Sequence, residues 1–238
     1  MRTVAYTNLC IICLFANRDV SRVMDMSCIF FSVGCPTCHC NELGFDEAPS
    51  LQGFAEDISG WSMDQVTNTS GMFAGAVLFN LPLNSWELGR VTDMAFMFER
   101  ARVFNQALDA WSVGRVTNME GMFAGALSFN QPLGTWDVGQ VTSTAAMFQT
   151  CFAFNQPLNT WNVQRVMSAA GMFSGTISFG MNICSWGPAL AAAGANVDDM
   201  FRDARSCPAV TCYFNCDDSR FTPDLTRDPP GSFCQNCF

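Results

Sequence analysis

The sequence predicts an α/β repeat protein: a solenoid with one short strand and one short helix in each 25-residue turn, closed by cysteine-rich caps. All six tryptophans of the 238-residue chain lie 25 residues apart, from Trp61 to Trp186. Apolar residues recur at fixed offsets from each tryptophan. Thirteen cysteines gather almost entirely before and after these repeats.

Five apolar columns share the period of the tryptophans and indicate a common core. Their members are Met63, Leu88, Val113, Val138 and Val163; Val66, Val91, Val116, Val141 and Val166; the Met-Phe pairs that start at Met72, Met97, Met122, Met147 and Met172; and Phe79, Phe104, Phe129, Phe154 and Phe179. The tryptophan rings alternate with polar neighbours, so we expect them inside with the valines. A single unit buries too little apolar surface to fold alone, and stability must arise between stacked units.

Two periods inside each unit predict its secondary structure. Between Leu133 and Val138, apolar and polar residues alternate, which is typical of a short strand. From Val141 to Phe154 the apolar residues fall three or four apart, the spacing of one helical face. Thr117-Asn118-Met119-Glu120 also matches a capping box that would start such a helix.

The repeat decays at both ends and thereby sets the domain organisation. Residues 61–185 hold five regular units, residues 18–60 a degenerate first unit with a cysteine-rich insertion at about 31–48, and residues 186–238 a degenerate last unit and a cysteine-rich C-terminal cap. Residues 1–17 contain one arginine and a short apolar run, compatible with a signal peptide or with a ragged terminal cap. This run is too short for a transmembrane segment.

The motif of the unit resembles a known family. The stretch "LDAWSVGRVTNMEGMFAGALSFNQP", from Leu108 to Pro132, is similar to the mycoplasma-type surface-lipoprotein repeat and to the wider BspA-like leucine-rich-repeat surface proteins. The similarity covers residues 54 to about 201. It implies a leucine-rich-repeat-like (LRR-like) solenoid of secreted or cell-surface character and a binding role, without indicating a ligand.

The composition argues against an enzyme. The chain has no lysine, and His39 is its one histidine, so a Schiff base, a phosphate-loop lysine and most nucleophile–base pairs are excluded. No cofactor is expected. The net charge of −9 makes nucleic acid a poor partner.

The cysteines predict disulfide-stapled caps in an oxidising compartment. Two C-x-x-C pairs leave zinc binding as an alternative, and unpaired thiols in a reducing cell are another. We expect no metal, and we expect Cys151 to be a small buried hydrophobe because alanine occupies its position in sister units. The disulfide candidates are Cys28, Cys35, Cys38, Cys40, Cys184, Cys207, Cys212, Cys216, Cys234 and Cys237.

Two polar columns beside the tryptophans form the candidate binding face. On the outward side of the expected strands they present a mixed polar strip for a protein or a glycan, with a merely solvated face as the alternative. The columns are Ser62, Glu87, Ser112, Asp137 and Asn162, and Gln65, Arg90, Arg115, Gln140 and Arg165.

Asparagines elsewhere in the repeat are expected to have a structural role. Asn80, Asn105, Asn130 and Asn155 are expected to form a ladder whose amides bond the backbone of adjacent turns. Asn68-Thr69-Ser70 is a glycosylation sequon, which is a weak signal alone.

These observations favour a non-catalytic binding protein outside the cell or at its surface. The alternative is an intracellular structural or scaffold solenoid with reduced or zinc-bound cysteines. The ligand and the oligomeric state do not follow from the sequence.

Overall fold

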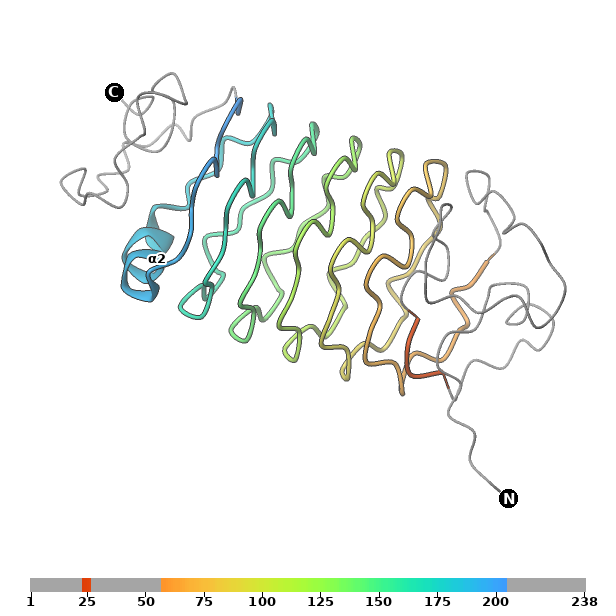
Figure 1. Cartoon of the computed structure of the whole chain (residues 1–238). Helices are drawn as coiled ribbons and strands as arrows, with labels where there is room; N and C mark the ends of the chain where they lie inside the picture. Colours follow the sequence, from red (N-terminus) through yellow and green to blue (C-terminus); the bar gives the residue numbers. More distant parts are fainter. Residues whose placement is uncertain (1–22, 27–56, 205–238) are drawn as a thin grey trace, which may run out of the picture.

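The computed structural model of the chain describes residues 23–26 and 57–204. In this part, successive segments lie side by side as coils of one elongated stack (Figure 1). Each coil is numbered from its tryptophan: coil 1 is 61–85, coil 2 is 86–110, coil 3 is 111–135, coil 4 is 136–160, coil 5 is 161–185, and the described part of coil 6 is 186–204.

Single parallel bridges join the coils. They connect Asp25 to Asn68, Asn68 to Asp93, Asp93 to Asn118, Asn118 to Ser143, Ser143 to Ser168, and Ser168 to Asn196. The bridging residue comes seven positions after the tryptophan in coils 1 to 5, and no longer strand occurs in the described ranges. The strand expected at Leu133–Val138 is therefore wrong, since turns and unpaired chain occupy these residues.

A series of reverse turns follows each bridge, and we call it the turn ribbon (residues 118–126 in coil 3). Alternate backbone N–H groups of the ribbon donate to the next coil, and the intervening ones close turns within the coil. In coil 3 the bonds between coils are Met119 to Ser143 (2.9 Å), Gly121 to Ala145 (2.8 Å), Phe123 to Met147 (2.8 Å) and Gly125 to Gln149 (2.8 Å).

The turn ribbon replaces the helix expected at Val141–Phe154, and that prediction is wrong. The backbone passes through the left-handed region at every fourth residue, as at Ala146 (φ 52°) and Thr150 (φ 53°), which no α-helix permits. Turns of this length bring every third or fourth side chain inward, so the apolar spacing imitates a helical face. Half of the backbone N–H groups become free to bond the neighbouring coil.

Aromatic columns fill the interior. Phe98 stacks on Phe123 with ring centres 5.6 Å apart, and Trp111 stacks on Trp136 at 6.3 Å. Both distances suit offset aromatic pairs. Trp136 is only 3% exposed, and its indole N–H donates to the backbone oxygen of Leu108 (3.0 Å). The predicted core position of the tryptophans is confirmed for Trp86 to Trp186, whereas Trp61, in coil 1, is half-buried.

The asparagine ladder is also confirmed. The backbone N–H of Asn130 donates to Asn105 Oδ1 (3.0 Å), and the backbone N–H of Asn155 donates to Asn130 Oδ1 (2.9 Å). The following glutamine strengthens each step, because Gln156 Nε2 donates to the same Oδ1 (3.1 Å). The backbone N–H of Gly180 donates to Asn155 Oδ1 (2.9 Å). The ladder ends there, because glycine has no side-chain amide that could accept a hydrogen bond from the next coil.

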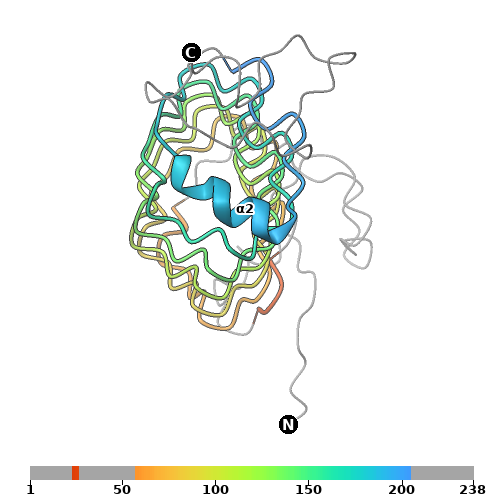
Figure 2. The same ribbon diagram turned by 90° about the vertical axis from the view of Figure 1, so that its left-hand side faces the viewer.

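Coil 6 departs from the repeat. The 3-10 helix η3 (Cys184–Trp186) leads into the α-helix α2 (Gly187–Ala193). Proline in the first turn and alanine-rich sequence favour this helix, and Gly194 ends it in the left-handed conformation (φ 65°). Viewed along the stack, α2 crosses the end of the nested coils (Figure 2). Leu190 of α2 is 2% exposed, so the helix covers apolar interior at this end.

Candidate binding surface

The ten residues predicted to bind form two columns along the stack, which we call the polar strip. In coil 3, Trp111, Val113 and Val116 are buried, and the residues between them, Ser112 and Arg115, face solvent. The other members repeat this arrangement and are exposed, except for Ser62, which is half-buried. The strip lies on turns and unpaired chain, and not on a strand face as expected.

Side-chain bonds between coils order part of the second column. Arg90 Nη1 donates to Gln65 Oε1 (2.7 Å), and Arg165 Nη1 donates to Gln140 Oε1. Arg115, in the middle of the column, has no hydrogen bond or ion pair with any described residue. No described residue therefore uses the N–H donors of its guanidinium group.

The first column carries the acidic groups of the strip. Asp137 Oδ1 accepts the backbone N–H of Gly139 (3.1 Å), and Asn162 Oδ1 accepts that of Gln164 (3.2 Å). Such bonds to the chain two residues on fix the direction of the side chain. Glu87 makes no such contact within the described ranges. The strip thus contains side chains of both charges, some held by hydrogen bonds and some without a partner among the described residues.

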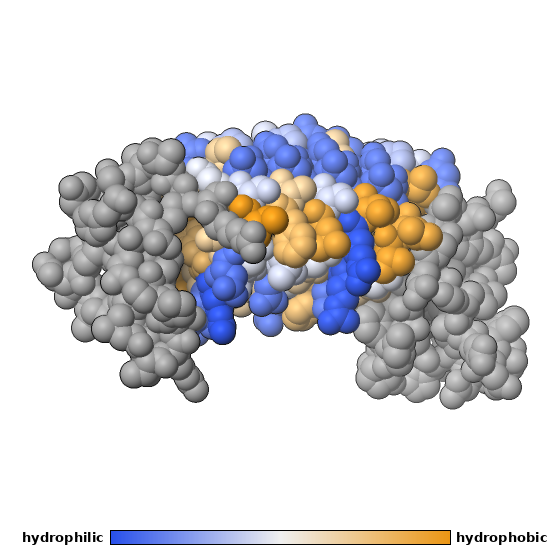
Figure 3. All heavy atoms as spheres, turned by 90° about the horizontal axis from the view of Figure 1, so that it is seen from above, coloured by the Kyte–Doolittle hydropathy of each residue, from blue (hydrophilic) through white to orange (hydrophobic). Residues whose placement is uncertain are grey.

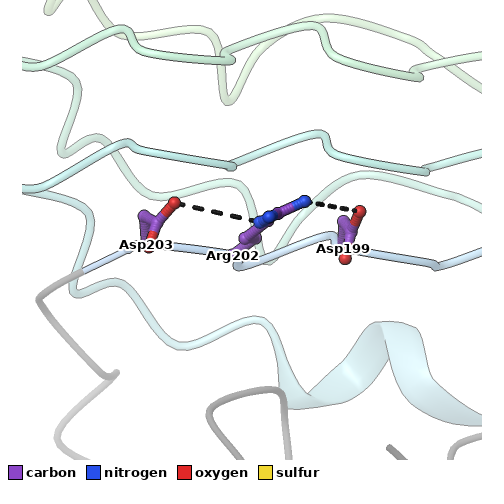
Figure 4. Close-up of polar contacts among 3 residues, drawn as sticks. All are labelled: Asp199, Arg202 and Asp203. Atoms are coloured by element: carbon purple, nitrogen blue, oxygen red, sulfur yellow. Dashed lines mark hydrogen bonds and ion pairs between the residues drawn. The ribbon is translucent and has the colours of Figure 1, made fainter. Parts of the chain in front are cut away.

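Ion pairs elsewhere on the described surface are exposed and weak. Arg202 lies between Asp199 and Asp203 in coil 6, with nitrogen–oxygen distances of 3.5 and 3.9 Å (Figure 4). Arg100 contacts Glu99 at 3.6 Å. Solvent-exposed pairs of this kind contribute about 0–1 kcal/mol each.

The sequon asparagine is engaged in the stack. Asn68 is half-buried, forms two parallel bridges, and its Oδ1 accepts the backbone N–H of Ser70 (2.9 Å). Asn118 does the same for Glu120 (3.1 Å), so the expected capping box at Thr117–Glu120 is wrong: Asn118 supplies the cap, and it caps a turn. Thr117 Oγ1 instead donates to the backbone oxygen of Thr92 in the previous coil (3.1 Å).

The structure describes two of the cysteines, and the other disulfide candidates and His39 lie outside the described residues. Cys151 is a buried free thiol, and burial raises its pKa well above the ordinary value. Cys184 is disulfide-bonded. Among the described residues no group of His, Cys, Asp or Glu is arranged to hold a metal ion.

An open hollow adjoins the C-terminal end of the polar strip. Its volume is about 540 Å³, and one wall is the small-residue face of α2. The lining residues are Gln164, Ser185, Pro188, Ala189, Ala192 and Ala193. A ligand on the strip could extend into this hollow, which the sequence did not indicate because α2 was not expected.

Sequence reasoning also missed a row of exposed apolar residues. Leu78, Val103, Phe152 and Ile177 are 38–61% exposed, although they sit beside core positions of the repeat. Each follows its tryptophan by 16 or 17 residues, so the period could have aligned them. They form a second surface, away from the polar strip.

Stacked coils that bury one set of columns and expose another define a repeat protein. The chain belongs to the family described as Mycoplasma protein of unknown function, DUF285, whose model matches residues 45–133 and 104–211. No curated protein and no solved structure matches the chain significantly. Within the described ranges, no helix is long and apolar enough to span a membrane.

Proposed function

We propose that the chain is a non-catalytic, LRR-like solenoid that presents the polar strip to a protein or glycan ligand at the cell surface or outside the cell. The observation that carries the proposal is the regular exposure of nine of the ten polar residues of the strip beside buried tryptophan and valine columns. Because each coil is hydrogen-bonded to the next, these side chains keep a fixed spacing. A pre-ordered surface loses little entropy on binding.

Arg115 is the centre of the proposed site. Arginine is enriched at protein interfaces and among the residues that dominate binding energy. Its column neighbours Arg90 and Gln140 are each held in a side-chain pair, whereas Arg115 has no partner among the described residues. A carboxylate of the ligand would find a bidentate donor at this position.

A protein ligand fits the strip better than a glycan. The tryptophans of coils 2 to 6 are 2–4% exposed, so these indole rings offer no stacking platform beside the strip. The strip instead offers guanidinium groups, carboxylates and amides. Polar and charged groups of both signs give specificity for a complementary protein surface.

The extracellular location is part of the proposal and rests on three observations. The family is described from Mycoplasma, and the repeat resembles surface-lipoprotein repeats. Cys184, which precedes α2, is disulfide-bonded, which supports oxidised caps. Mass spectrometry of protein taken from its source cells, alkylated with and without reduction, tests the location: free thiols throughout would favour the intracellular scaffold.

Binding is tested with two probes, a glycan array and the biotinylated surface proteins of the source cells. The test variant is Arg115→Gln, because coils 1 and 4 already have glutamine at this position. The control is Arg100→Thr, which also removes one positive charge but lies outside the strip, and coil 4 has threonine at its position. We expect Arg115→Gln to weaken binding about tenfold or more, and Arg100→Thr to leave it unchanged. Binding to neither probe, or equal binding by Arg115→Gln, would overturn the proposal.

A further inference from the structure

A row of exposed and half-buried apolar residues lines one corner of the stack, and we call it the apolar ridge. It consists of Val77, Leu78, Val103, Leu127, Phe152 and Ile177 and is interrupted by Arg102. Four of the seven large hydrophobic residues that are exposed in the described ranges belong to it. In Figure 3, which looks onto this edge of the stack, apolar side chains gather along its length with hydrophilic ones between them.

Backbone contacts hold the ridge in order. The N–H of Ser128 donates to the oxygen of Arg102 (3.1 Å), and that of Ala153 donates to the oxygen of Leu127 (3.2 Å). Corresponding residues of adjacent coils therefore follow one another at the spacing of paired strands, about 4.8 Å. The ridge is a narrow row of apolar side chains with this period, running over five coils.

The spacing of side chains along the ridge limits which partner surface can pack against it over its whole length. An α-helix repeats its side chains about every 5.4 Å, and an extended strand about every 6.7 Å on one face, so either drifts out of register over five coils. A second ridge has the same period along its whole length. Two copies of the chain can therefore pack ridge to ridge in continuous register.

The sequence of the ridge selects an antiparallel pair. A two-fold axis at coil 3 brings Leu127 against its own copy, Arg102 against Phe152, and Val77 with the adjacent Leu78 against Ile177. Arg102 has no ion pair with any described residue, and Phe152 is 42% exposed. Guanidinium groups bind favourably to aromatic faces. A parallel pair would instead bring the two Arg102 side chains together, and like charges oppose this.

We propose that the chain forms an antiparallel homodimer through the apolar ridge. Two-fold pairs with self-complementary surfaces are the commonest form of homo-oligomer. In coil 6, helix α2 occupies the position that the polar strip has in the other coils, and it lies at the lower edge of the stack in Figure 1. Residues 195–204 run from there to the upper edge, where the apolar ridge lies. The strips of the two copies therefore face away from the interface, and the dimer presents both of them.

The first test is the oligomeric state of the full chain by sedimentation. Phe152→Arg copies the residue of coil 2, and Arg102→Phe copies that of coil 4, so the fold already accommodates both side chains at this position. We expect a dimer for the wild type, a rise of about tenfold or more in the dissociation constant for Phe152→Arg, and recovery in the double variant Arg102→Phe/Phe152→Arg. The control Gln140→Arg adds the same charge on the polar strip and should dimerise normally.

A second test fixes the direction of packing. Leu78→Glu and Ile177→Arg should each be monomeric alone, and their mixture should form a heterodimer through an ion pair between residues 78 and 177. A parallel pair never brings these positions together, so a mixture that stays monomeric would overturn the antiparallel arrangement. A monomeric wild type, or a dimer indifferent to Phe152→Arg, would overturn the proposal as a whole. Neither result bears on ligand binding by the polar strip.

Discussion

The ring of Phe96 lies over Gly121 of the next coil, so that a Cβ atom on Gly121 would stand 2.5 Å from Phe96 Cε1. This pair belongs to a two-coil alternation at the left-handed positions of the turn ribbon. Coils 1, 3 and 5 have glycine there, and coils 2, 4 and 6 have a side chain. The glycines are Gly71, Gly75, Gly121, Gly125, Gly171 and Gly175, and the others are Phe96, Arg100, Ala146, Thr150, Asp199 and Asp203.

Substitution of Gly121 tests whether the close approach of the Phe96 ring requires glycine at this position. Gly121→Ala combines left-handed strain with a clash against Phe96, and we expect it to lower the free energy of unfolding by about 2 kcal/mol or more. Gly171→Ala has the same strain (φ +61°) but no neighbour closer than 3.9 Å, so its loss should be smaller. Gly89→Ala, with open space around it, is the neutral control. Urea unfolding followed by tryptophan fluorescence measures all three, and equal losses at residues 121 and 171 would contradict the contact.

The alternation also predicts that coils are not interchangeable. Deletion of 111–135 stacks coil 2 on coil 4 and places Ala146 where Gly121 now receives Phe96. Deletion of 86–110 has the same length but stacks coil 1 on coil 3, where all four left-handed positions are glycine. We expect the first variant to be less stable by about 2 kcal/mol, measured by urea unfolding. Equal stability would show that single coils, and not pairs, are the unit of packing.

The period and the core columns could be predicted from the sequence because burial repeats with the chain. Trp136, Val141 and Phe148 are buried, as their spacing predicted. Asn130 accepts a hydrogen bond from the next coil, as the predicted ladder requires. The secondary structure could not be predicted in the same way. Apolar spacing of three and four suits both a helix and a series of turns, and Phe96 or Thr150 gives no sign that its φ is positive.

One signal for the turns was present in the sequence. Glycine recurs four residues apart in the ribbons of coils 1, 3 and 5, as at Gly121 and Gly125, and helices disfavour glycine in their interior. The exposure of the polar strip followed from its position between Trp and Val columns. The hollow beside α2 and the apolar ridge needed coordinates, because both arise where the chain departs from an average coil.

The asparagine ladder should contribute to stability through its oxygen atoms. Asn130→Ala leaves the backbone N–H of Asn155 without its acceptor, and the Gln156 amide keeps only the backbone oxygen of residue 130 (3.0 Å), so we expect a loss of about 1–3 kcal/mol. Asn130→Asp keeps an acceptor at the same place and should lose less. Asn159→Ala, at an exposed side chain, is the control, with an effect within about 0.5 kcal/mol. Thermal or urea unfolding that ranks aspartate with alanine would contradict a role for the oxygen.

Cys151 should be inert in the native protein. Its side chain is fully buried, its thiol lies 3.0 Å from the backbone oxygen of Ala126, and burial raises its pKa. Because the thiolate is the nucleophile, both access and charge state oppose alkylation. We expect iodoacetamide to spare Cys151 in native protein up to mildly alkaline pH and to modify it once denaturant unfolds the stack, with mass spectrometry of the peptide around residue 151 as the readout. Cys151→Ala copies coils 1 to 3 and should cost only about 1 kcal/mol. Rapid alkylation of the native thiol would mean that coils 3 and 4 separate readily, in conflict with their shared hydrogen bonds.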